Sequence, residues 1–370
     1  MPSETNDVRG IAKLLSDFAQ QKQEYENTKV KCGFVGRSGV GKSSLINAIT
    51  GEKLAPVGFG KETTVESHEY LHRGLVLVDL PGCGTERFPT TEYVKKLNLS
   101  GYDLFIFVTE SRFFQDDKIV YSQLVSEMAK PCFLVRNKFD LAVADAAHDG
   151  HNLTEAEIKG AIEGNIRENL APLDVKKLYM VSARRPGHYD LPSLLDDIQD
   201  SFDGMKKLRL ENDLAAWSQE ALMRKRANAM RITSWYAGIA ALNGLNPIIG
   251  LDVTVDVGVL RRLARQVAEI YSLTKEQEEY WRDLLKGPDG RALLQKTVSL
   301  TLKYGTEAAI TTILKALGKR ELPKVFAKFI PFAGQVLACA AGAGVTYTFG
   351  KGLVDEYHGM AEELLADLNS

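Results

Sequence analysis

The feature that most limits the fold is a glycine-rich run at residues 36–44. An apolar run at 30–35 predicts a buried strand before it, and a helical pattern begins after it at Leu45. A phosphate-binding loop has this order of strand, loop and helix, whereas an accidental glycine-rich turn rarely has both neighbours. Glycines let backbone N–H groups approach phosphate oxygens, and the helix adds its positive N-terminal end. We expect the whole run to bind nucleotide phosphates: Gly36, Arg37, Ser38, Gly39, Val40, Gly41, Lys42, Ser43 and Ser44.

Five side chains and backbone groups have expected roles at the phosphates and at Mg²⁺. Lys42 would place a positive charge between the β- and γ-phosphates, and the Ser43 hydroxyl would take one position on Mg²⁺. A later strand ends in a D-x-x-G sequence, in which Asp79 would hold Mg²⁺ through a water and the Gly82 N–H would sense the γ-phosphate. Thr64 lies between these two motifs, where a Mg²⁺-binding switch threonine belongs.

Two further motifs indicate the base. A strand runs directly into the sequence N-K-F-D, which places Asn137 and Lys138 around the base and Asp140 at its edge. A carboxylate accepts hydrogen bonds from guanine N1–H and the 2-amino group, and adenine offers neither donor. Ser182 and Ala183 end the last predicted strand, as a guanine loop does. All four motifs in order, each at the carboxyl end of a strand, predict a protein that binds GTP and GDP.

Length and composition favour two domains in a reducing, intracellular compartment. The chain has 370 residues, and its 45% hydrophobic and 25% charged residues are ordinary values for folded proteins. The four cysteines have no paired spacing for a disulfide framework or a metal. The formal net charge of −2 argues against a general nucleic-acid binder, so we expect no nucleic-acid partner.

The order of predicted elements indicates an α/β domain and a helical domain. Apolar residues at helical spacing predict a helix over 8–28, and helical runs dominate after residue 205. Thr154 and Glu157 predict a capping box for one helix between the strands. We expect a P-loop GTPase domain with a mostly parallel sheet at 30–205, and an all-helical domain formed by the N-terminal segment 1–29 and the C-terminal region 206–370. The predicted strands are 30–35, 66–71, 75–79, 102–108, 131–135 and 177–181.

Several segments carry a family resemblance: residues 79–84 with Phe88, Pro89 and Tyr93, residues 102–106, 133–136 and 188–192, and residues 330–335 with Thr346 and Tyr347. On these segments the chain resembles the immunity-related GTPases, a dynamin-like, interferon-inducible type of GTPase, over nearly its whole length. This resemblance implies a split helical domain, GTP-dependent self-assembly and work on intracellular membranes in cell-autonomous immunity. Two features depart from the family pattern: Asn137 stands where the family usually has Thr or Ser, and Pro2 replaces the Gly that some members acylate.

The sequence leaves the source of hydrolysis open. Small switch GTPases commonly carry a water-orienting Gln directly after D-x-x-G, and here that position is Cys83, so a lone subunit should hydrolyse GTP slowly. The resemblance implies that Glu62 is the catalytic switch glutamate, used across a nucleotide-facing dimer. Without the resemblance, a solvated loop carboxylate is the better interpretation of Glu62. Arg37 would either stabilise charge on the phosphates or face solvent.

Two uncharged segments, 234–251 and 329–350, approach the length of a membrane-spanning helix. Both are interrupted by Pro and by Asn, Gln or Gly, so buried helices are the favoured interpretation. A basic stretch would allow reversible contact with anionic lipid, although most such runs are solvated helix faces. We expect a cytoplasmic protein that associates reversibly with intracellular membranes. The basic stretch comprises Lys206, Lys207, Arg209, Arg224, Lys225, Arg226 and Arg231.

The leading functional hypothesis is therefore a self-assembling GTPase, hydrolysing GTP to GDP, that acts at membranes. The alternative is a slow-turnover GTP switch that recruits a protein partner without remodelling a membrane, and Cys83 favours it. A ribosome- or tRNA-associated GTPase would share the motifs, but the chain lacks a basic, aromatic-interleaved appendage.

Overall fold

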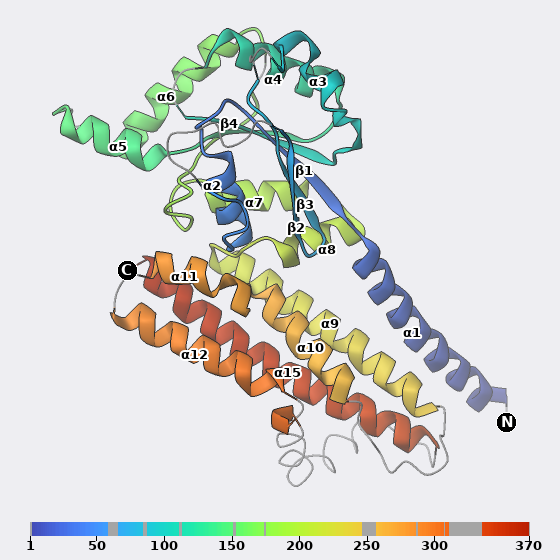
Figure 1. Ribbon diagram of the computed structural model, residues 1–370. Helices are drawn as coiled ribbons and strands as arrows, with labels where there is room; N and C mark the ends of the chain where they lie inside the picture. The colour runs from blue at the N-terminus through green and yellow to red at the C-terminus, as the bar shows by residue number, and fades with distance from the viewer. Residues whose placement is uncertain are drawn as a thin grey trace. The chain divides into compact units, whose positions relative to one another are not determined.

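The structure is a computed structural model, and the chain divides into two compact units (Figure 1). One unit consists of Met1–Thr28, Leu222–Glu278 and Leu285–Asp367. The other consists of Lys29–Ala221, Glu279–Leu284 and Leu368–Ser370. The structure describes residues 2–57, 66–83, 87–110, 113–150, 153–173, 175–245, 257–285, 288–306, 308–310 and 335–369.

The second unit is built on a six-stranded sheet with the strand order β2-β3-β1-β4-β5-β6. All neighbouring strands are parallel except β2 and β3, which confirms the predicted mostly parallel sheet. Every predicted strand is found, with ends that differ by no more than two residues. The strands are β1 (Val30–Val35), β2 (His68–His72), β3 (Leu75–Asp79), β4 (Leu104–Thr109), β5 (Cys132–Arg136) and β6 (Leu178–Met180).

The central strands are continuous apolar runs because helices cover both faces of a parallel sheet. All six residues of β4 are buried, and in β1 only Lys31 is partly exposed. The register aligns Phe34 with Asp79, and Thr109 with Arg136. The loops that follow β1, β3, β4 and β5 therefore leave the sheet at the same edge, where the carboxyl ends of its parallel strands meet.

Helices connect these strands, and their ends follow local sequence signals. The predicted capping box is confirmed: Thr154 Oγ1 accepts a hydrogen bond from Glu157 N (3.3 Å), and Glu157 Oε2 accepts one from Thr154 N (2.8 Å). The helices between the strands and after β6 are α2 (Lys42–Thr50), η1 (Thr90–Glu92), α3 (Tyr93–Lys96), η2 (Leu99–Gly101), α4 (Gln115–Glu127), α5 (Phe139–His148), α6 (Glu155–Leu170), α7 (Leu191–Asp200), α8 (Gly204–Asp213) and α11 (Glu278–Leu284).

The C-terminal end of α2 is completed by residues from the segment after α8. Ala215 N donates to Ile49 O (2.8 Å), and the Trp217 indole N–H donates to Ala48 O (3.0 Å). The Trp217 side chain is buried and packs on Trp281 of α11, with ring centroids 5.4 Å apart. These bonds satisfy carbonyls that a helix end otherwise leaves unpaired.

The first unit is helical, and the N-terminal helix packs with the C-terminal ones. The rings of Tyr25 in α1 and Trp235 in α9 lie 5.8 Å apart, and the Trp235 indole N–H donates to Gln21 Oε1 (3.1 Å). This contact confirms the predicted fold class, in which the N-terminal helix joins an all-helical part of the chain. The helices are α1 (Pro2–Asn27), α9 (Gln219–Leu245), α10 (Val257–Ile270), η3 (Lys275–Gln277), α12 (Pro288–Gly305) and α15 (Gln335–Asn369).

The two uncharged segments fall partly within this unit. The first begins in α9, where Trp235, Ala237 and Ala241 are buried, and its positions 246–251 lie outside the described residues. The second includes the start of α15, and its positions 329–334 also lie outside them. In the part of the chain that the structure describes, no helix is long and apolar enough to cross a membrane.

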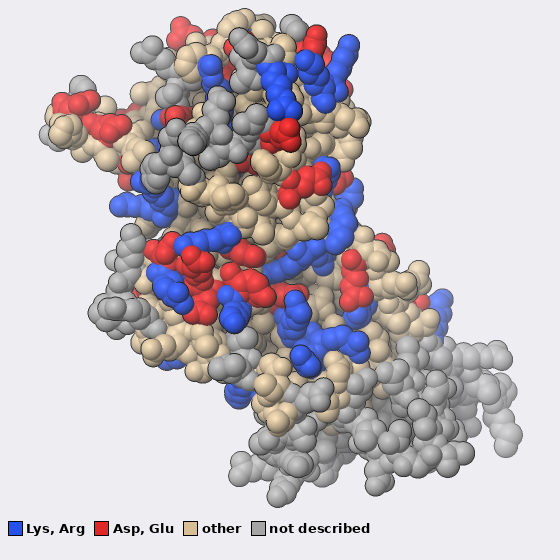
Figure 2. Space-filling view, in the orientation of Figure 1, with Lys and Arg blue, Asp and Glu red and all other residues tan. Residues whose placement is uncertain are grey.

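The basic stretch does not form a free basic surface. Most of its side chains contact partners inside the protein, and basic and acidic side chains are intermingled on the face drawn in Figure 2. The contacts are Lys206 with Asp103 (2.6 Å), Lys207 with Asp200 (2.8 Å), buried Arg209 with Asp213 (2.7 Å), buried Lys225 with the Ile270 carbonyl (2.6 Å) and Arg226 with Asp355 (2.7 Å).

Candidate nucleotide site

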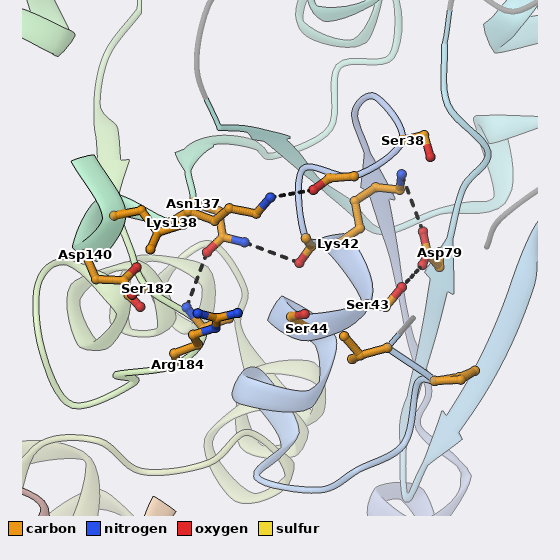
Figure 3. Close-up of a pocket in the computed structure, with 16 residues that line it drawn as sticks. Ser38, Lys42, Ser43, Ser44, Asp79, Asn137, Lys138, Asp140, Ser182 and Arg184 are labelled. Carbon is orange, nitrogen blue, oxygen red and sulfur yellow. Dashed lines mark hydrogen bonds and ion pairs between the residues drawn. The ribbon is translucent and has the colours of Figure 1, made fainter. Parts of the chain in front are cut away.

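A cleft of about 370 Å³ opens at the carboxyl edge of the sheet (Figure 3). Its walls come from the loop after β1, from α2 and the segment that follows it, from the end of β3, and from the segments that follow β5 and β6. The cleft brings together twelve of the residues that the sequence predicts. These are Ser38, Gly39, Gly41, Lys42, Ser43, Ser44, Asp79, Asn137, Lys138, Asp140, Ser182 and Ala183.

Two glycines of the phosphate-binding loop cannot be replaced without strain. Gly36 has φ 142°, and a Cβ there would lie 2.2 Å from the carbonyl oxygen of Val108. Gly41 has φ 90°, and a Cβ there would lie 2.4 Å from Asn137 Nδ2. These positions require glycine because the loop turns in the left-handed region while it touches its neighbours. Gly36 and Val40 belong to the loop but do not line the cleft.

Lys42 is the first residue of α2, and its ammonium group lies inside the loop. Its side chain is 5% exposed, and Nζ donates to the carbonyls of Gly36 (3.1 Å) and Arg37 (3.2 Å). Asp79 Oδ1 lies 3.7 Å from the same nitrogen. Burial lowers the pKa of Lys42, and the Asp79 carboxylate opposes that shift. A cation held in this way would meet an anionic ligand in the cleft.

Ser43 and Asp79 form an oxygen pair beside that cation (Figure 3). Ser43 Oγ donates to Asp79 Oδ2 at 2.5 Å, and the Asp79 side chain is 2% exposed. Among the described residues, no group of three or more His, Cys, Asp or Glu side chains could hold a metal alone. Mg²⁺ prefers oxygen ligands and commonly takes one or two from the protein and others from phosphates and water. The pair therefore fits a Mg²⁺–nucleotide complex.

The loop after β5 joins three segments through Asn137, which is buried. Its Nδ2 donates to the carbonyls of Val40 (3.0 Å) and Gly41 (3.3 Å), and its Oδ1 accepts from Ala183 N (3.3 Å). Lys138 Nζ donates to the Gly39 carbonyl at 2.7 Å, so it also reaches back to the phosphate-binding loop. These bonds connect the loop after β5 to the phosphate-binding loop and to the segment after β6.

The base end of the cleft contains the remaining predicted groups. Asp140 lies in the first turn of α5 and lines the cleft. The Ser182 hydroxyl is buried and has no hydrogen-bond partner among the described residues. Tyr189 packs edge-on against Phe139 (5.0 Å between centroids) and supports this loop from behind. A carboxylate at one end and a lysine in a glycine-rich loop at the other suit a guanine nucleotide.

The D-x-x-G segment is packed against the phosphate-binding loop. A Cβ at Gly82 would lie 3.1 Å from Ser38 N, so Gly82 is close to the loop although it does not line the cleft. Cys83 is 3% exposed, lies in the hydrophobic core, and donates from Sγ to Asp117 Oδ1 (3.6 Å). Burial raises the pKa of the Cys83 thiol to about 12. This side chain does not face the cleft.

Some predicted residues lie elsewhere, and some lining residues were not predicted. The Arg37 guanidinium stacks 4.1 Å above the Phe114 ring and does not line the cleft. Glu62 and Thr64 lie outside the described residues, as does Gly84. The lining residues that sequence reasoning missed are Pro56, Val57, Leu141 and Arg184. Leu141 and Arg184 directly follow predicted motifs, so their place in the cleft could have been predicted from the sequence. No sequence pattern points to Pro56 or Val57.

The mostly parallel sheet, the glycine-rich loop with its lysine, and the N-K-F-D loop at one edge define a P-loop GTPase. The model of the family described as interferon-inducible GTPase matches residues 6–273, and the chain belongs to this family. It is a GTP-hydrolysing enzyme. The immunity-related GTPase resemblance found in the sequence is thereby confirmed.

Two curated relatives and one solved structure are similar to this chain. The chain is 25% identical to interferon-inducible GTPase 5 of Rattus norvegicus over 359 residues, covering 91% of this chain and 74% of the relative. It is 28% identical to interferon-inducible GTPase 1 of Mus musculus over 260 residues, covering 67% and 62%. Among solved structures, Aquifex aeolicus Era bound to GDP and AlF4⁻ has a TM-score of 0.36 and 18% identity, covering 58% of this chain and 68% of that one.

Proposed function

We propose that this GTPase binds Mg²⁺–GTP in the cleft, self-assembles in the GTP-bound state and acts at intracellular membranes. The observation that carries the binding mode is the meeting of Lys42 and the Ser43–Asp79 pair at one end of the cleft with Asp140 at the other. Lys42 would bind the β- and γ-phosphates. Loop N–H groups from 36–44 would surround the phosphates, and Asp140 would read guanine with Asn137 and Lys138 around the base.

The metal would be held by residues of this chain that lie beside Lys42. Ser43 would supply a direct oxygen ligand, and Asp79 would act through a water, as their 2.5 Å contact allows. Thr64 is proposed as a further ligand on sequence grounds alone. Bound Mg²⁺ would neutralise charge that develops on the phosphates, while Gly82 N–H would sense the γ-phosphate.

Self-assembly is proposed because Cys83 stands directly after D-x-x-G, where small switch GTPases commonly carry a water-orienting Gln. Cys83 occupies the position where such a group often lies, and its thiol is buried in the core and bonded to Asp117. Glu62 of a second subunit would then position or deprotonate water at the γ-phosphate. Arg37 stacks on Phe114, which favours a supporting role over direct contact with phosphate.

The proposed division of labour places GTP hydrolysis in 30–205 and membrane contact in the helical parts at 1–29 and 206–370. The membrane part of the proposal rests on the family resemblance. The paired basic stretch gives it no added support, so any contact would be peripheral and reversible, from the cytoplasm. The competing proposal is a slow-turnover switch that recruits a protein partner, and the buried thiol of Cys83 favours it.

The deciding experiment measures GTPase specific activity across a hundredfold range of protein concentration, with and without anionic liposomes. We expect activity to rise with concentration, and Glu62→Ala to bind GTP normally while losing about 10²–10⁴-fold in turnover. Glu66→Ala is the matched control, because Glu66 is an exposed carboxylate paired with Arg87. Flat specific activity together with a fully active Glu62→Ala would favour the slow switch. An effect of liposomes on the rate would support the membrane part separately.

A further inference from the structure

Glu110 is the first residue after β4, and the sheet places it beside the loop that contains Asn137 and Lys138. β4 and β5 are parallel, with Thr109 in register with Arg136. Directly after β5, Asn137 N donates to the carbonyl of Thr109, the last residue of β4, at 2.8 Å, so the segments that follow the two strands begin side by side. The position of Glu110 is therefore fixed by backbone bonds. It does not line the cleft and has no expected role in phosphate or base binding.

The Glu110 carboxylate contacts the ammonium group of Lys138. That nitrogen also donates to the Gly39 carbonyl at 2.7 Å, so it has one partner in the phosphate-binding loop and one at the end of β4. The two side chains are about equally exposed, 36% for Lys138 and 34% for Glu110. Lys138 has φ 57°, and α5 begins directly after it. Its side chain thus ties together three segments of the site.

A second cation, Arg136, lies at the end of β5 in register with Thr109, the residue before Glu110. Arg136 is 7% exposed and donates to the carbonyl of Asn137, while its Nε has no partner among the described residues. Burial lowers the pKa of Arg136, and the negative charge of Glu110 opposes that shift. Two positive groups, two residues apart, therefore flank Asn137 at the start of the base-reading loop, and Glu110 supplies negative charge to both.

We propose that Glu110 is a positioning residue that sets guanine-nucleotide affinity by holding Lys138 and the N-K-F-D loop in their binding arrangement. This inference rests on the proposed role of that loop in reading guanine. Without the carboxylate, Lys138 keeps only the Gly39 carbonyl as a hydrogen-bond partner among the described residues. The base and the loop contacts are common to GDP and GTP, so both affinities fall by the same factor. Turnover at saturating GTP is unchanged, because Glu110 does not line the cleft.

The test uses the full chain and two fluorescent probes, the methylanthraniloyl derivatives of GDP and GTPγS. Glu110→Gln keeps the shape and removes the charge, and we expect it to raise both Kd values about fivefold, the upper range for a half-exposed ion pair. The factor should shrink between about 0.01 M and about 1 M salt, because salt screens such pairs. Glu92→Gln is the matched control: Glu92 forms an exposed ion pair with Lys96 away from the cleft, and its Kd values should not change.

A double-mutant cycle assigns the effect to Lys138. Glu110→Gln should change Kd by less than twofold in a Lys138→Met background, because the partner is already absent. An unchanged Kd in Glu110→Gln, an undiminished effect in Lys138→Met, or a loss for GTPγS without one for GDP would each overturn the inference.

Asp140→Asn, measured in the same assay, distinguishes the role of the N-K-F-D loop in reading guanine from the role of Glu110 in positioning that loop. It should weaken GTP binding and admit XTP, because its amide replaces the acceptor for guanine N1–H with a mixed donor and acceptor. If Asp140→Asn changes base selectivity and Glu110→Gln does nothing, only the role of Glu110 is refuted. If Asp140→Asn also leaves GTP affinity and XTP binding unchanged, the assignment of the base-reading loop fails, and the inference with it.

Discussion

Replacing Asn137 by Ala should destabilise the unit that contains the sheet, because one amide joins three loops there. The side chain is 1% exposed. Ala cannot donate to the Val40 and Gly41 carbonyls or accept from the Ala183 N–H, so these groups lose their bonds to the Asn137 amide. All three contacts are made within the protein itself, so we expect the loss with and without nucleotide.

The size of the effect follows from the geometry of these contacts. A buried hydrogen bond contributes about 0.5–1.5 kcal/mol net, and one of the three, at 3.0 Å, has near-ideal length. The other two are 3.3 Å long and are counted as half. Together they amount to about 2 kcal/mol, which lowers the melting temperature of a unit of this size by about 4–8 °C.

The measurement is calorimetric melting of the full chain without nucleotide. Asn169→Ala is the matched control, because Asn169 is exposed on α6 and, among the described residues, its side chain bonds within its own helix, to the carbonyl and side chain of Asn165. Asn137→Thr should fall between Ala and the parent, since a hydroxyl replaces part of the amide. A melting temperature of Asn137→Ala within about 1 °C of the parent would refute the reasoning, because it would mean that water replaces all three bonds at no cost.

Three further predictions concern single positions. Lys42→Ala should weaken GTP and GDP binding more than tenfold, because it removes charge-assisted bonds worth about 1.5–3 kcal/mol; normal binding in a titration would contradict the loop assignment. Gly36→Ala should destabilise more than Gly39→Ala in thermal melting: both positions have positive φ (142° and 87°), but a Cβ at 36 also meets the Val108 carbonyl at 2.2 Å while one at 39 meets nothing within 4 Å; equal losses would exclude that clash. Burial, aided by a neighbouring arginine, lowers the pKa of His72 below its ordinary 6.5, so the unfolded chain takes up a proton first and stability falls as the pH drops through about 6.5. The melting temperature of His72→Gln should depend less on pH over that range, and an equal dependence would show that another group is responsible.

The strands were predictable because the central strands of a parallel sheet are buried on both faces and therefore appear in the sequence as continuous apolar runs. β4 is buried at every position, and five of its six residues, 104–108, form a continuous apolar run that is visible in the sequence. The glycine-rich loop was predictable for a related reason. Only glycine fits the backbone at 36 and 41, so the loop can be recognised in the sequence by its glycines.

The parts that were not predicted depend on residues distant in the chain. The basic stretch looks like a solvated surface in sequence, but Asp103 and Asp355 supply partners for Lys206 and Arg226 from distant positions. Pro56 reaches the cleft because Asn47 binds the backbone of Ala55, a contact that no local pattern indicates. Local sequence patterns therefore predict the helices and strands. Which side chains form ion pairs or line the cleft depends on contacts between distant segments.

The bond between Trp217 and the end of α2 has a consequence for protein synthesis. The ribosome delivers α2 early, yet Ala48 and Trp217 are 169 residues apart in the chain. Until Trp217 has emerged, the last turn of the phosphate-binding helix must bond to water instead, and a nascent chain that lacks it also lacks part of the cover over α2. Firm GTP binding should therefore be acquired only after more than half of the 370 residues have been translated. Before that point, the early glycine-rich loop is exposed on a ribosome-bound chain that cannot yet close its nucleotide site.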